Sequence, residues 1–298
     1  MKRVHVLMAT YNGERYLRQQ IDSILAQKGV EVILTVRDDG STDTTCDILK
    51  AYSDKGCLKW YRGNNVGPAQ NFMLLLQEAE DADYYAFSDQ DDYWESDKLL
   101  AAVNQLEEAQ NDLALYFSQT CLADEALHPL PHQIHIRPLL TYGESLVYQF
   151  IGGCTMVLTH ALREAVNRYK PQTLYMHDVW IYCVCLAIGG KAFFDAKPHI
   201  YYRQHAQNVV GQGNRRNEWK RRVGRIAHLE QARYKTALEL IEGYANEMPA
   251  SNLALTQDFI KAKHNLLARL RLLCDKRLAT SSPATSRRFR LALLMGIY

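Results

Sequence analysis

The stretch that decides the fold is 83-DYYAFSDQDDYWESDKLLAAVNQLEEAQ-110, where an apolar run, an acidic cluster and a helical pattern follow one another. The apolar run is typical of a buried strand, and the residues after Trp94 indicate a helix. Between these two elements stand three aspartates, Asp89, Asp91 and Asp92. Like charges this close repel and raise one another's pKa values. The loop therefore needs a ligand or a cation that compensates its charge.

The same alternation of strand and helix runs through the first 110 residues. Strands are expected at 3–9, 31–37, 57–62 and 83–88. Such alternation predicts an α/β fold with a mostly parallel central sheet covered by helices. In open sheets of this kind, ligands bind beyond the carboxyl ends of the strands. The polar segments "TYNGE", "RDDGSTD" and "SDQDD" each follow a strand, so we expect them to meet at one ligand.

The pattern is less regular after residue 112. We expect strands at 113–123, 152–160, 191–195 and 199–205, and a helix at 176–190. Beyond the glycine-rich segment 211–214, helices are expected at 215–243, 252–275 and 285–297. We place a domain boundary near residue 212, which separates an α/β domain (1–212) from a helical C-terminal region (213–298).

The composition is that of a globular protein, with 47% hydrophobic and 23% charged residues. No secretory signal is recognised, and no run approaches the roughly 20 apolar residues that a membrane span needs. The seven cysteines include no CxxC pair. This argues against a disulfide framework or a zinc site, and it favours a cytoplasmic protein.

The charge is unevenly distributed along the chain. Residues 213–298 carry 17 basic and 7 acidic side chains, whereas residues 1–212 carry the remaining 18 basic and 26 acidic ones. The segments "NEWKRRVGRIAHL" and "RRFRLALLMGIY" combine basic and apolar residues, which suits a peripheral helix on an anionic membrane surface. A solvated basic face and a homo-oligomer contact are the alternatives. With one aromatic and no recognised motif in the basic run, we expect no nucleic-acid partner.

The acidic loop suits a divalent cation. An EF-hand is excluded because Trp94 stands where that loop needs glycine. Magnesium is typically held by one or two carboxylates together with substrate phosphates, so one acid can bind the metal while another contacts the nucleotide. His205 is a candidate ligand of the same metal, and Arg203 is a candidate phosphate contact. The alternative for the acids is a polar loop that caps the next helix.

Two further acidic positions are candidates. Asp38 and Asp39 end a strand, where carboxylates can accept hydrogen bonds from a ribose hydroxyl or a base. A tight turn with a helix cap is the alternative. Neither GxGxxG nor GxxxxGK[ST] occurs, which argues against a P-loop NTPase or a standard dinucleotide domain. Asp178, in the first turn of a predicted helix, is either a general base or a cap.

Together these segments resemble the family 2 glycosyltransferases, which have the GT-A nucleotide-sugar-binding fold. The resemblance covers about residues 1–205, in the family's order, through "ATYNGERYLRQQIDSILAQ", "RDDGSTDTT", "NNVGPAQNF", "SDQDDYWESDKL", "GGCTMVL" and "HDVW". The set with "SDQDD", "HDVW" and "YRQH" most resembles bacterial rhamnosyltransferases of polysaccharide and lipopolysaccharide biosynthesis. One departure is His177-Asp178, where many members have Glu-Asp.

The resemblance implies that Thr10 and Tyr11 line the base and ribose pocket, that Asp39 faces the base and that Asp89 lies near the ribose. It also implies that Asp91 binds the divalent metal, Mg²⁺ or Mn²⁺, and that Asp178 is the catalytic base. The sequence leaves open whether Asp91 or Asp92 is the better metal ligand. With the residue-based candidates, the predicted nucleotide-sugar site comprises Thr10, Tyr11, Asn12, Asp38, Asp39, Asp89, Gln90 and Arg203, and the predicted metal ligands are Asp91 and His205.

The implied activity is an inverting, metal-dependent transfer of a sugar from a nucleoside-diphosphate sugar. The donor is dTDP-rhamnose or a UDP-sugar. The acceptor is a hydroxyl of a growing cell-surface polysaccharide or of a lipid-linked saccharide, which would place the protein peripherally at the inner face of the cell membrane. The alternative is a non-catalytic nucleotide-sugar binding or scaffold protein on the same fold.

Overall fold

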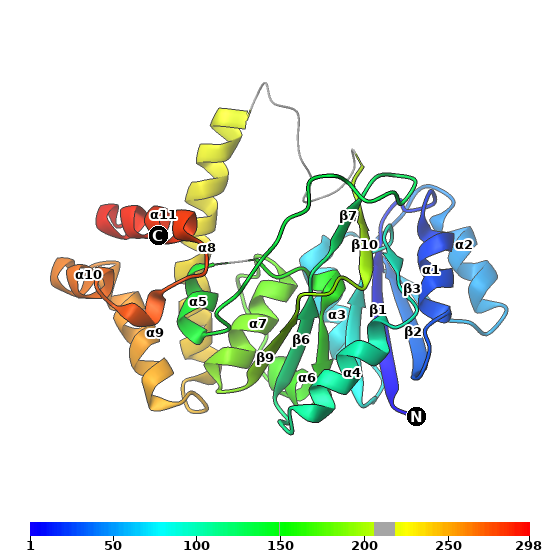
Figure 1. Cartoon of the computed structure of the whole chain (residues 1–298), viewed down its shortest axis with the longest axis horizontal. Coiled ribbons are helices and arrows are strands. Elements are labelled where there is room, and N and C mark those ends of the chain that lie inside the picture. The colour runs from blue at the N-terminus through cyan, green and yellow to red at the C-terminus, as the bar shows by residue number, and fades with distance from the viewer. Residues whose placement is uncertain (149, 206–217) are drawn as a thin grey trace.

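The computed structural model describes residues 1–148, 150–205 and 218–298, and for 218–230 it describes the helical backbone alone. The strands are β1 (Arg3–Thr10), β2 (Glu31–Asp38), β3 (Lys59–Arg62), β4 (Tyr84–Ser88), β5 (Tyr93–Trp94), β6 (Ala114–Ser118), β7 (Cys121–Ala123), β8 (Val157–Thr159), β9 (Lys191–Asp195) and β10 (Ile200–Arg203). Seven of them form a central sheet in the order β3-β2-β1-β4-β8-β6-β9, and the other three form a small sheet in the order β5-β10-β7 (Figure 1).

Helices flank the central sheet and continue beyond it in the C-terminal region (Figure 1). They are α1 (Leu17–Leu25), α2 (Thr45–Ser53), α3 (Pro68–Glu78), α4 (Lys98–Glu108), α5 (Tyr142–Val147), α6 (His160–Asn167), α7 (His177–Ala187), α8 (Glu218–Tyr244), α9 (Ala250–Ala262), α10 (Leu266–Leu273) and α11 (Pro283–Met295), with short 3₁₀ turns at Gly153–Thr155 and Lys276–Leu278. None of the helices in the described ranges is long and apolar enough to cross a membrane.

Successive residues of the central strands enter two separate hydrophobic cores. In β1, Val6 and Met8 belong to the core that includes α1, α2 and α4, whereas Leu7 belongs to the core that includes α3, α6 and α7. The same alternation places Ala86 and Phe87 of β4 in different cores. This period of two is the expected consequence of a strand whose side chains point to opposite faces. The sheet is therefore covered on both sides.

The carboxyl ends of the parallel strands lie on the same side of the sheet, which we call its carboxyl edge. β1 pairs in parallel with β2 and with β4, and the register places Thr10 beside Asp38 and Met8 beside Ser88. β8 alone runs antiparallel to its neighbours β4 and β6, while β9 is parallel to β6. The predicted α/β fold with a mostly parallel sheet is confirmed. The three polar segments predicted to meet leave the sheet from the same edge.

Some predicted boundaries are wrong. The helix expected at 95–110 begins at Lys98, because the preceding Tyr93 and Trp94 form β5 and pair antiparallel with β10. The single strand expected at 113–123 is divided into β6 and β7, which belong to different sheets.

The segment 152–160 was expected to be one strand. Only Val157–Thr159 is extended, after a 3₁₀ turn, and helix α6 follows at once. Neither α6 nor the short helix α5 was predicted.

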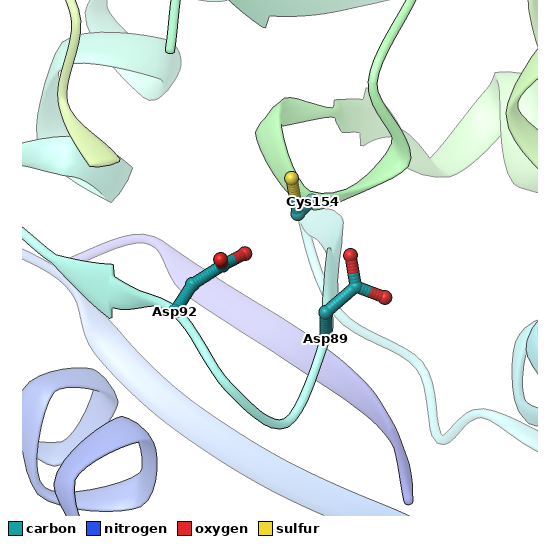
Figure 2. Close-up of side chains that lie close together, drawn as sticks. All are labelled: Asp89, Asp92 and Cys154. Atoms are coloured by element: carbon teal, nitrogen blue, oxygen red, sulfur yellow. The ribbon is translucent and has the colours of Figure 1, made fainter. Parts of the chain in front are cut away.

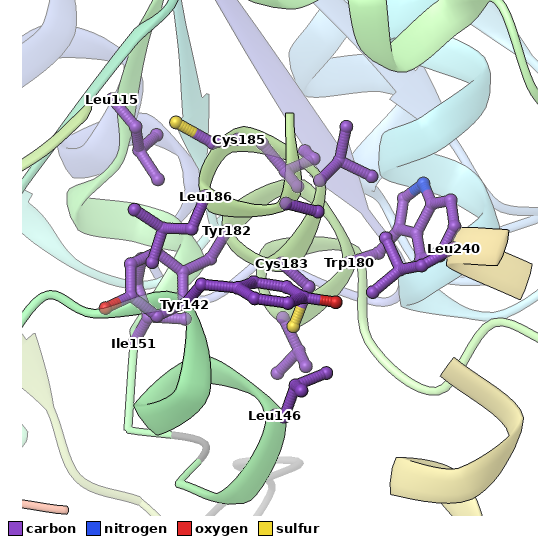
Figure 3. Close-up of a cluster of buried hydrophobic side chains, with 14 of the residues drawn as sticks. Leu115, Tyr142, Leu146, Ile151, Trp180, Tyr182, Cys183, Cys185, Leu186 and Leu240 are labelled. Atoms are coloured by element: carbon purple, nitrogen blue, oxygen red, sulfur yellow. The ribbon is translucent and has the colours of Figure 1, made fainter. Parts of the chain in front are cut away.

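The C-terminal helices extend one of the two cores. Leu240, Phe259 and Phe289 are buried in the same cluster as residues of α5 and α7, and Figure 3 shows Leu240 beside Trp180 of α7. The helix expected at 252–275 is interrupted at Asn265, whose side chain accepts a hydrogen bond from the Ala268 amide and so caps α10. The predicted boundary near 212 and the glycine-rich segment 211–214 lie outside the described residues, so the domain division stays a prediction.

Candidate functional site

Asp38 shapes the loop that follows β2. Its carboxylate is fully buried and accepts hydrogen bonds from the amides of Gly40 (3.2 Å) and Ser41 (2.9 Å). It also accepts bonds from the hydroxyls of Thr10 (3.1 Å) and Ser41. Because these bonds use both carboxylate oxygens, Asp38 and Thr10 hold the ends of β1 and β2 together. Their contact with a nucleotide stays a prediction.

Asp39 joins this loop to the segment before α3. Its carboxylate accepts bonds from the Arg37 guanidinium (2.6 Å) and from the amides of Val66 (3.1 Å) and Gly67 (2.9 Å). The Arg37–Asp39 ion pair is almost completely buried. Two backbone amides and a guanidinium fix the orientation of this carboxylate at the sheet edge. The expected contact of Asp39 with a nucleotide base stays a prediction.

The loops after β1 and β4 are fastened by Gln90. Its amide oxygen accepts a bond from the Tyr11 backbone N–H (2.9 Å), and its amide nitrogen donates to the Tyr11 carbonyl (3.1 Å). A Cβ at Gly13 would lie 2.1 Å from Oε1 of Gln90, so a larger residue there would displace this amide. Asn12 ties β1 to the β2 loop by accepting a bond from the Thr42 amide (2.8 Å). The Tyr11 side chain, 49% exposed, remains available to a ligand.

The acidic loop encloses a close group of Asp89, Asp92 and Cys154, whose ligand atoms lie within 4.8 Å of one another (Figure 2). Asp92 is 1% exposed. One of its oxygens accepts a bond from the Arg203 amide (3.2 Å), and the other has no hydrogen-bond partner among the described residues. Burial, then the neighbouring carboxylates, raises the pKa values of Asp89 and Asp92. The acids therefore lie as close together as the sequence suggested, and neighbouring carboxylates disfavour the ionisation of both.

Arg203 holds the acidic loop in place through hydrogen bonds. Its Nε donates to the Asp91 carbonyl (2.8 Å), and its other guanidinium nitrogens donate to Gln19 Oε1 (2.7 Å) and to the Glu125 carbonyl. The guanidinium also lies 4.3 Å from the ring centroid of Tyr16. These contacts make Arg203 a positioning residue for the loop. The expected contact of Arg203 with phosphate stays a prediction.

The two predicted metal ligands are in direct contact. Nε2 of His205 lies 2.8 Å from Oδ2 of Asp91, and the two side chains are 7% and 19% exposed. A carboxylate of this kind suits Mg²⁺ or Mn²⁺, and an imidazole adds a nitrogen donor. Asp92 is instead bonded to Arg203 and lies beside a thiol. These donor types suit a divalent cation, and Asp91, not Asp92, contacts the other predicted ligand, His205. The ligand assignment stays a prediction.

Asp178 lies in the first turn of α7. Its carboxylate accepts hydrogen bonds from the Gly153 amide (3.0 Å) and from the Val179 amide (2.7 Å), which orient it. The positive end of the helix dipole favours a negative charge at this position. Burial is stronger than these effects and raises the pKa of Asp178 to about 6. The Gly153 amide that bonds Asp178 is adjacent in sequence to Cys154 of the acidic group, so Asp178 lies near that group. The charge of Asp178 also contributes to the raised pKa of Asp89.

His177, where many family members have an acid, is part of the core. Its ring lies 4.2 Å from the Phe72 ring and 5.0 Å from the Phe87 ring, measured between centroids. Burial lowers the pKa of His177 to about 3, so the imidazole is neutral at ordinary pH. The substitution therefore adds no charge beside Asp178.

Several residues near the site were not predicted. Lys98 is 1% exposed, and its ammonium lies 3.6 Å from the ring centroid of Trp94, which is a cation–π geometry. No hydrogen-bond partner of this ammonium is found within the described ranges, and burial lowers the pKa of Lys98 to about 7. Lys98 and Cys154 lie in segments that resemble the family, but nothing in their local pattern indicates burial beside the acids.

Glu239 of α8 is a second unpredicted residue. It is 7% exposed and accepts bonds from the Tyr169 hydroxyl (2.7 Å) and from the amides of Gln172 (3.1 Å) and Thr173 (2.8 Å). These bonds hold the loop that leads into α7 and Asp178. The two parts of the chain are more than 60 residues apart, so no local signal reveals this contact.

The fold is shared with nucleotide-sugar transferases of known structure. Over its whole length the chain is similar to S. aureus TarS 1–349 in complex with UDP-GlcNAc, with a TM-score of 0.64, 18% identity and 80% of that chain covered. It also matches mannosyltransferase PcManGT from Pyrobaculum calidifontis in complex with GDP-Man and Mn²⁺, with a TM-score of 0.56, 16% identity, and 99% and 86% of the two chains covered. The fold is GT-A.

Residues 5–170 match the model of the family described as Glycosyl transferase family 2, and the chain belongs to that family. It is 29% identical to the dTDP-rhamnosyl transferase RfbG of Shigella flexneri, with 74% of this chain and 83% of that protein covered. It is 28% identical to the UDP-Glc:alpha-D-GlcNAc-diphosphoundecaprenol beta-1,3-glucosyltransferase WfaP of Escherichia coli, with 70% and 80% covered. The protein is a glycosyltransferase.

Proposed function

We propose that the protein transfers a sugar from a nucleoside-diphosphate sugar to a saccharide hydroxyl, with inversion at the anomeric carbon. The observation that carries this proposal is the position of Asp178, a buried carboxylate that is oriented by the Gly153 amide, next to Cys154 of the acidic group. A general base is most effective when its pKa lies near the working pH, and burial moves Asp178 toward that range. A protein that only bound nucleotide sugars would not require such a base.

In this reaction the Asp178 carboxylate accepts the proton of the acceptor hydroxyl as its oxygen bonds to the anomeric carbon. The bond from that carbon to the phosphate oxygen breaks, and the nucleoside diphosphate leaves. Asp39 and the exposed Tyr11 ring are the proposed contacts of the base and ribose, at the ends of β2 and β1. Gln90 and Asn12 keep these loops in one arrangement through their bonds to Tyr11 and Thr42.

Asp91 and His205 are the proposed ligands of Mg²⁺ or Mn²⁺. Support comes from their 2.8 Å contact and from the Mn²⁺ in the PcManGT complex. A bound divalent cation would neutralise the charge that develops on the departing diphosphate. Arg203 supports this role indirectly, because it holds the Asp91 carbonyl and the Asp92 carboxylate.

The proposed donor is dTDP-rhamnose, on the strength of the similarity to RfbG, with a UDP-sugar as the second candidate because TarS binds one. The proposed acceptor is a growing cell-surface polysaccharide or a lipid-linked saccharide, since WfaP is named for a diphosphoundecaprenol acceptor. Such an acceptor would place the protein peripherally at the inner face of the cell membrane.

The proposal is tested by incubating the protein with dTDP-rhamnose, UDP-glucose, UDP-GlcNAc or GDP-mannose and diphospholipid-linked saccharides, with Mn²⁺, Mg²⁺ or EDTA. Mass spectrometry would detect a product one sugar heavier, formed only with metal, and NMR would show the inverted anomeric configuration. Tight binding of a nucleotide sugar with no product from any acceptor would instead favour a non-catalytic scaffold.

A further inference from the structure

The helices α10 and α11 carry an unusual number of exposed apolar side chains. Fifteen large hydrophobic residues are exposed in the described part of the chain, and seven of them lie between 266 and 297. Leu266 and Leu267 at the start of α10 are 63% and 69% exposed, and Leu291 and Leu294 of α11 are 56% and 51% exposed. Single exposed leucines are ordinary on protein surfaces, but a group of this size on two helices marks an interaction site.

The exposed residues belong to one surface because the two helices are neighbours. The Arg269 guanidinium of α10 donates to the Leu294 carbonyl of α11 (3.3 Å), and it also lies against Gly296 at the end of α11. Each helix also has an inner face that is buried in the core, with Leu272 on α10 and Phe289 on α11. The exposed apolar residues are therefore additional to those that pack the helices onto the protein. Figure 1 shows both helices at the end of the molecule opposite β2 and β3.

The residues around this surface are mainly basic, which favours a negatively charged partner. Residues 266–298 contain seven basic residues and one acid, Asp275. Asp275 is already paired with Arg277 (2.6 Å), and Arg271, Arg287 and Arg288 are exposed. A second copy of the same surface would bring two positive faces together, which is unfavourable. An anionic bilayer would accept both the arginines and the leucines.

We propose that the α10–α11 surface binds the protein to an anionic phospholipid bilayer. The leucines and Met295 would enter the boundary between headgroups and acyl chains, and the arginines would contact lipid phosphates. This inference rests on the proposed function, because membrane binding would give the protein access to a lipid-linked acceptor. It specifies that α10, as well as the basic C-terminal segment, makes the contact with the bilayer.

The test is co-sedimentation with vesicles of phosphatidylglycerol and phosphatidylcholine, compared with vesicles of phosphatidylcholine alone. We expect binding to the anionic vesicles that weakens as salt is raised. The double variant Leu267→Gln/Leu294→Gln should bind at least tenfold more weakly. The matched control Leu25→Gln/Leu139→Gln, which changes exposed leucines elsewhere, should bind like the wild type. Circular dichroism would establish that each variant is folded.

Absence of wild-type binding, equal binding to both vesicle types, or equal binding by both double variants would overturn the inference. So would a dimer in sedimentation velocity that the Leu267→Gln/Leu294→Gln variant dissociates, because the surface would then join two copies of the chain. Binding of UDP and dTDP with Mn²⁺ is measured on the same samples and should not differ between variants. Vesicle binding without sugar transfer would contradict the proposed function and leave this inference standing.

Discussion

The acidic edge of the sheet and the C-terminal helical region are held in place by different forces. At the edge, buried Asp39 and Arg203 each make several hydrogen bonds to segments distant in the chain, and buried Asp38 accepts bonds from its own loop and from Thr10. The C-terminal helices are instead fixed mainly by apolar packing, in which Leu240 and Phe259 share a core with α7. Figure 3 shows Leu240 in this core. Polar bonds therefore fix the loops at the strand ends, whereas α7, which carries Asp178, is supported by apolar packing together with the hydrogen bonds of Gly153 and Glu239.

The largest effect is expected at Asp178, where the two regions meet. Replacing a positioned general base typically costs about 10²–10⁴-fold in rate. We expect Asp178→Asn to lose turnover by a factor in this range and to keep its affinity for the donor, because the nucleotide loops are unchanged. Steady-state kinetics and donor titration measure the two quantities. Asp81→Asn, an exposed control, should behave like the wild type; turnover of Asp178→Asn within a few-fold of it would remove Asp178 from this role.

The next effect is the dependence on pH. Because burial raises the pKa of Asp178 to about 6, we expect kcat to fall about tenfold for each pH unit below that value. A flat profile between about pH 5 and 7 would contradict this assignment.

The ionisation of Asp178 should also affect stability: the free energy of unfolding should fall as the pH rises, whereas kcat should rise. The folded state holds this proton more tightly than the unfolded chain, whose carboxyl has the ordinary value of 3.8. The stabilising contribution of the protonated group is present below about pH 4, and about 3 kcal/mol of it is lost as the pH rises to about 6. Asp178→Asn should therefore melt at a higher temperature than the wild type at about pH 7.5, but not at about pH 4. Thermal unfolding at the two pH values checks this.

A smaller effect on rate is expected from Glu239, whose hydrogen bonds join α8 to the loop that leads into α7. Glu239→Ala leaves two amides and the Tyr169 hydroxyl without their acceptor, so the free energy of unfolding should fall by roughly 2–4 kcal/mol. The loop that leads into α7 should loosen, which lowers kcat several-fold without changing UDP affinity. Glu239→Gln should retain part of both quantities, and the exposed control Glu108→Gln should retain all. A loss of UDP affinity as large as the loss of kcat would show that the effect of Glu239 is not specific to the Asp178 side of the site.

The two regions also differ in how much of them could be predicted from the sequence. The parallel strands and their acidic loops are local features, so Asp38, Asp89 and Asp91 could be placed at one sheet edge from the run of strands and helices alone. The burial of Lys98 beneath the loop and the contact of Glu239 with residues 172–173 could not, because each depends on side chains brought together by packing. The interruption at Asn265 was missed for a similar reason, since both flanking segments favour helix.

The central claim is that Asp91 and His205 complete a metal-dependent nucleotide-sugar site at the acidic edge. Its most direct test is isothermal titration calorimetry of UDP and dTDP, with and without Mn²⁺, against the wild type, Asp91→Ala and Asp92→Asn. We expect Mn²⁺ to strengthen nucleotide binding in the wild type and in Asp92→Asn, and we expect Asp91→Ala to abolish this gain. An undiminished Mn²⁺-dependent gain in Asp91→Ala would contradict the claim.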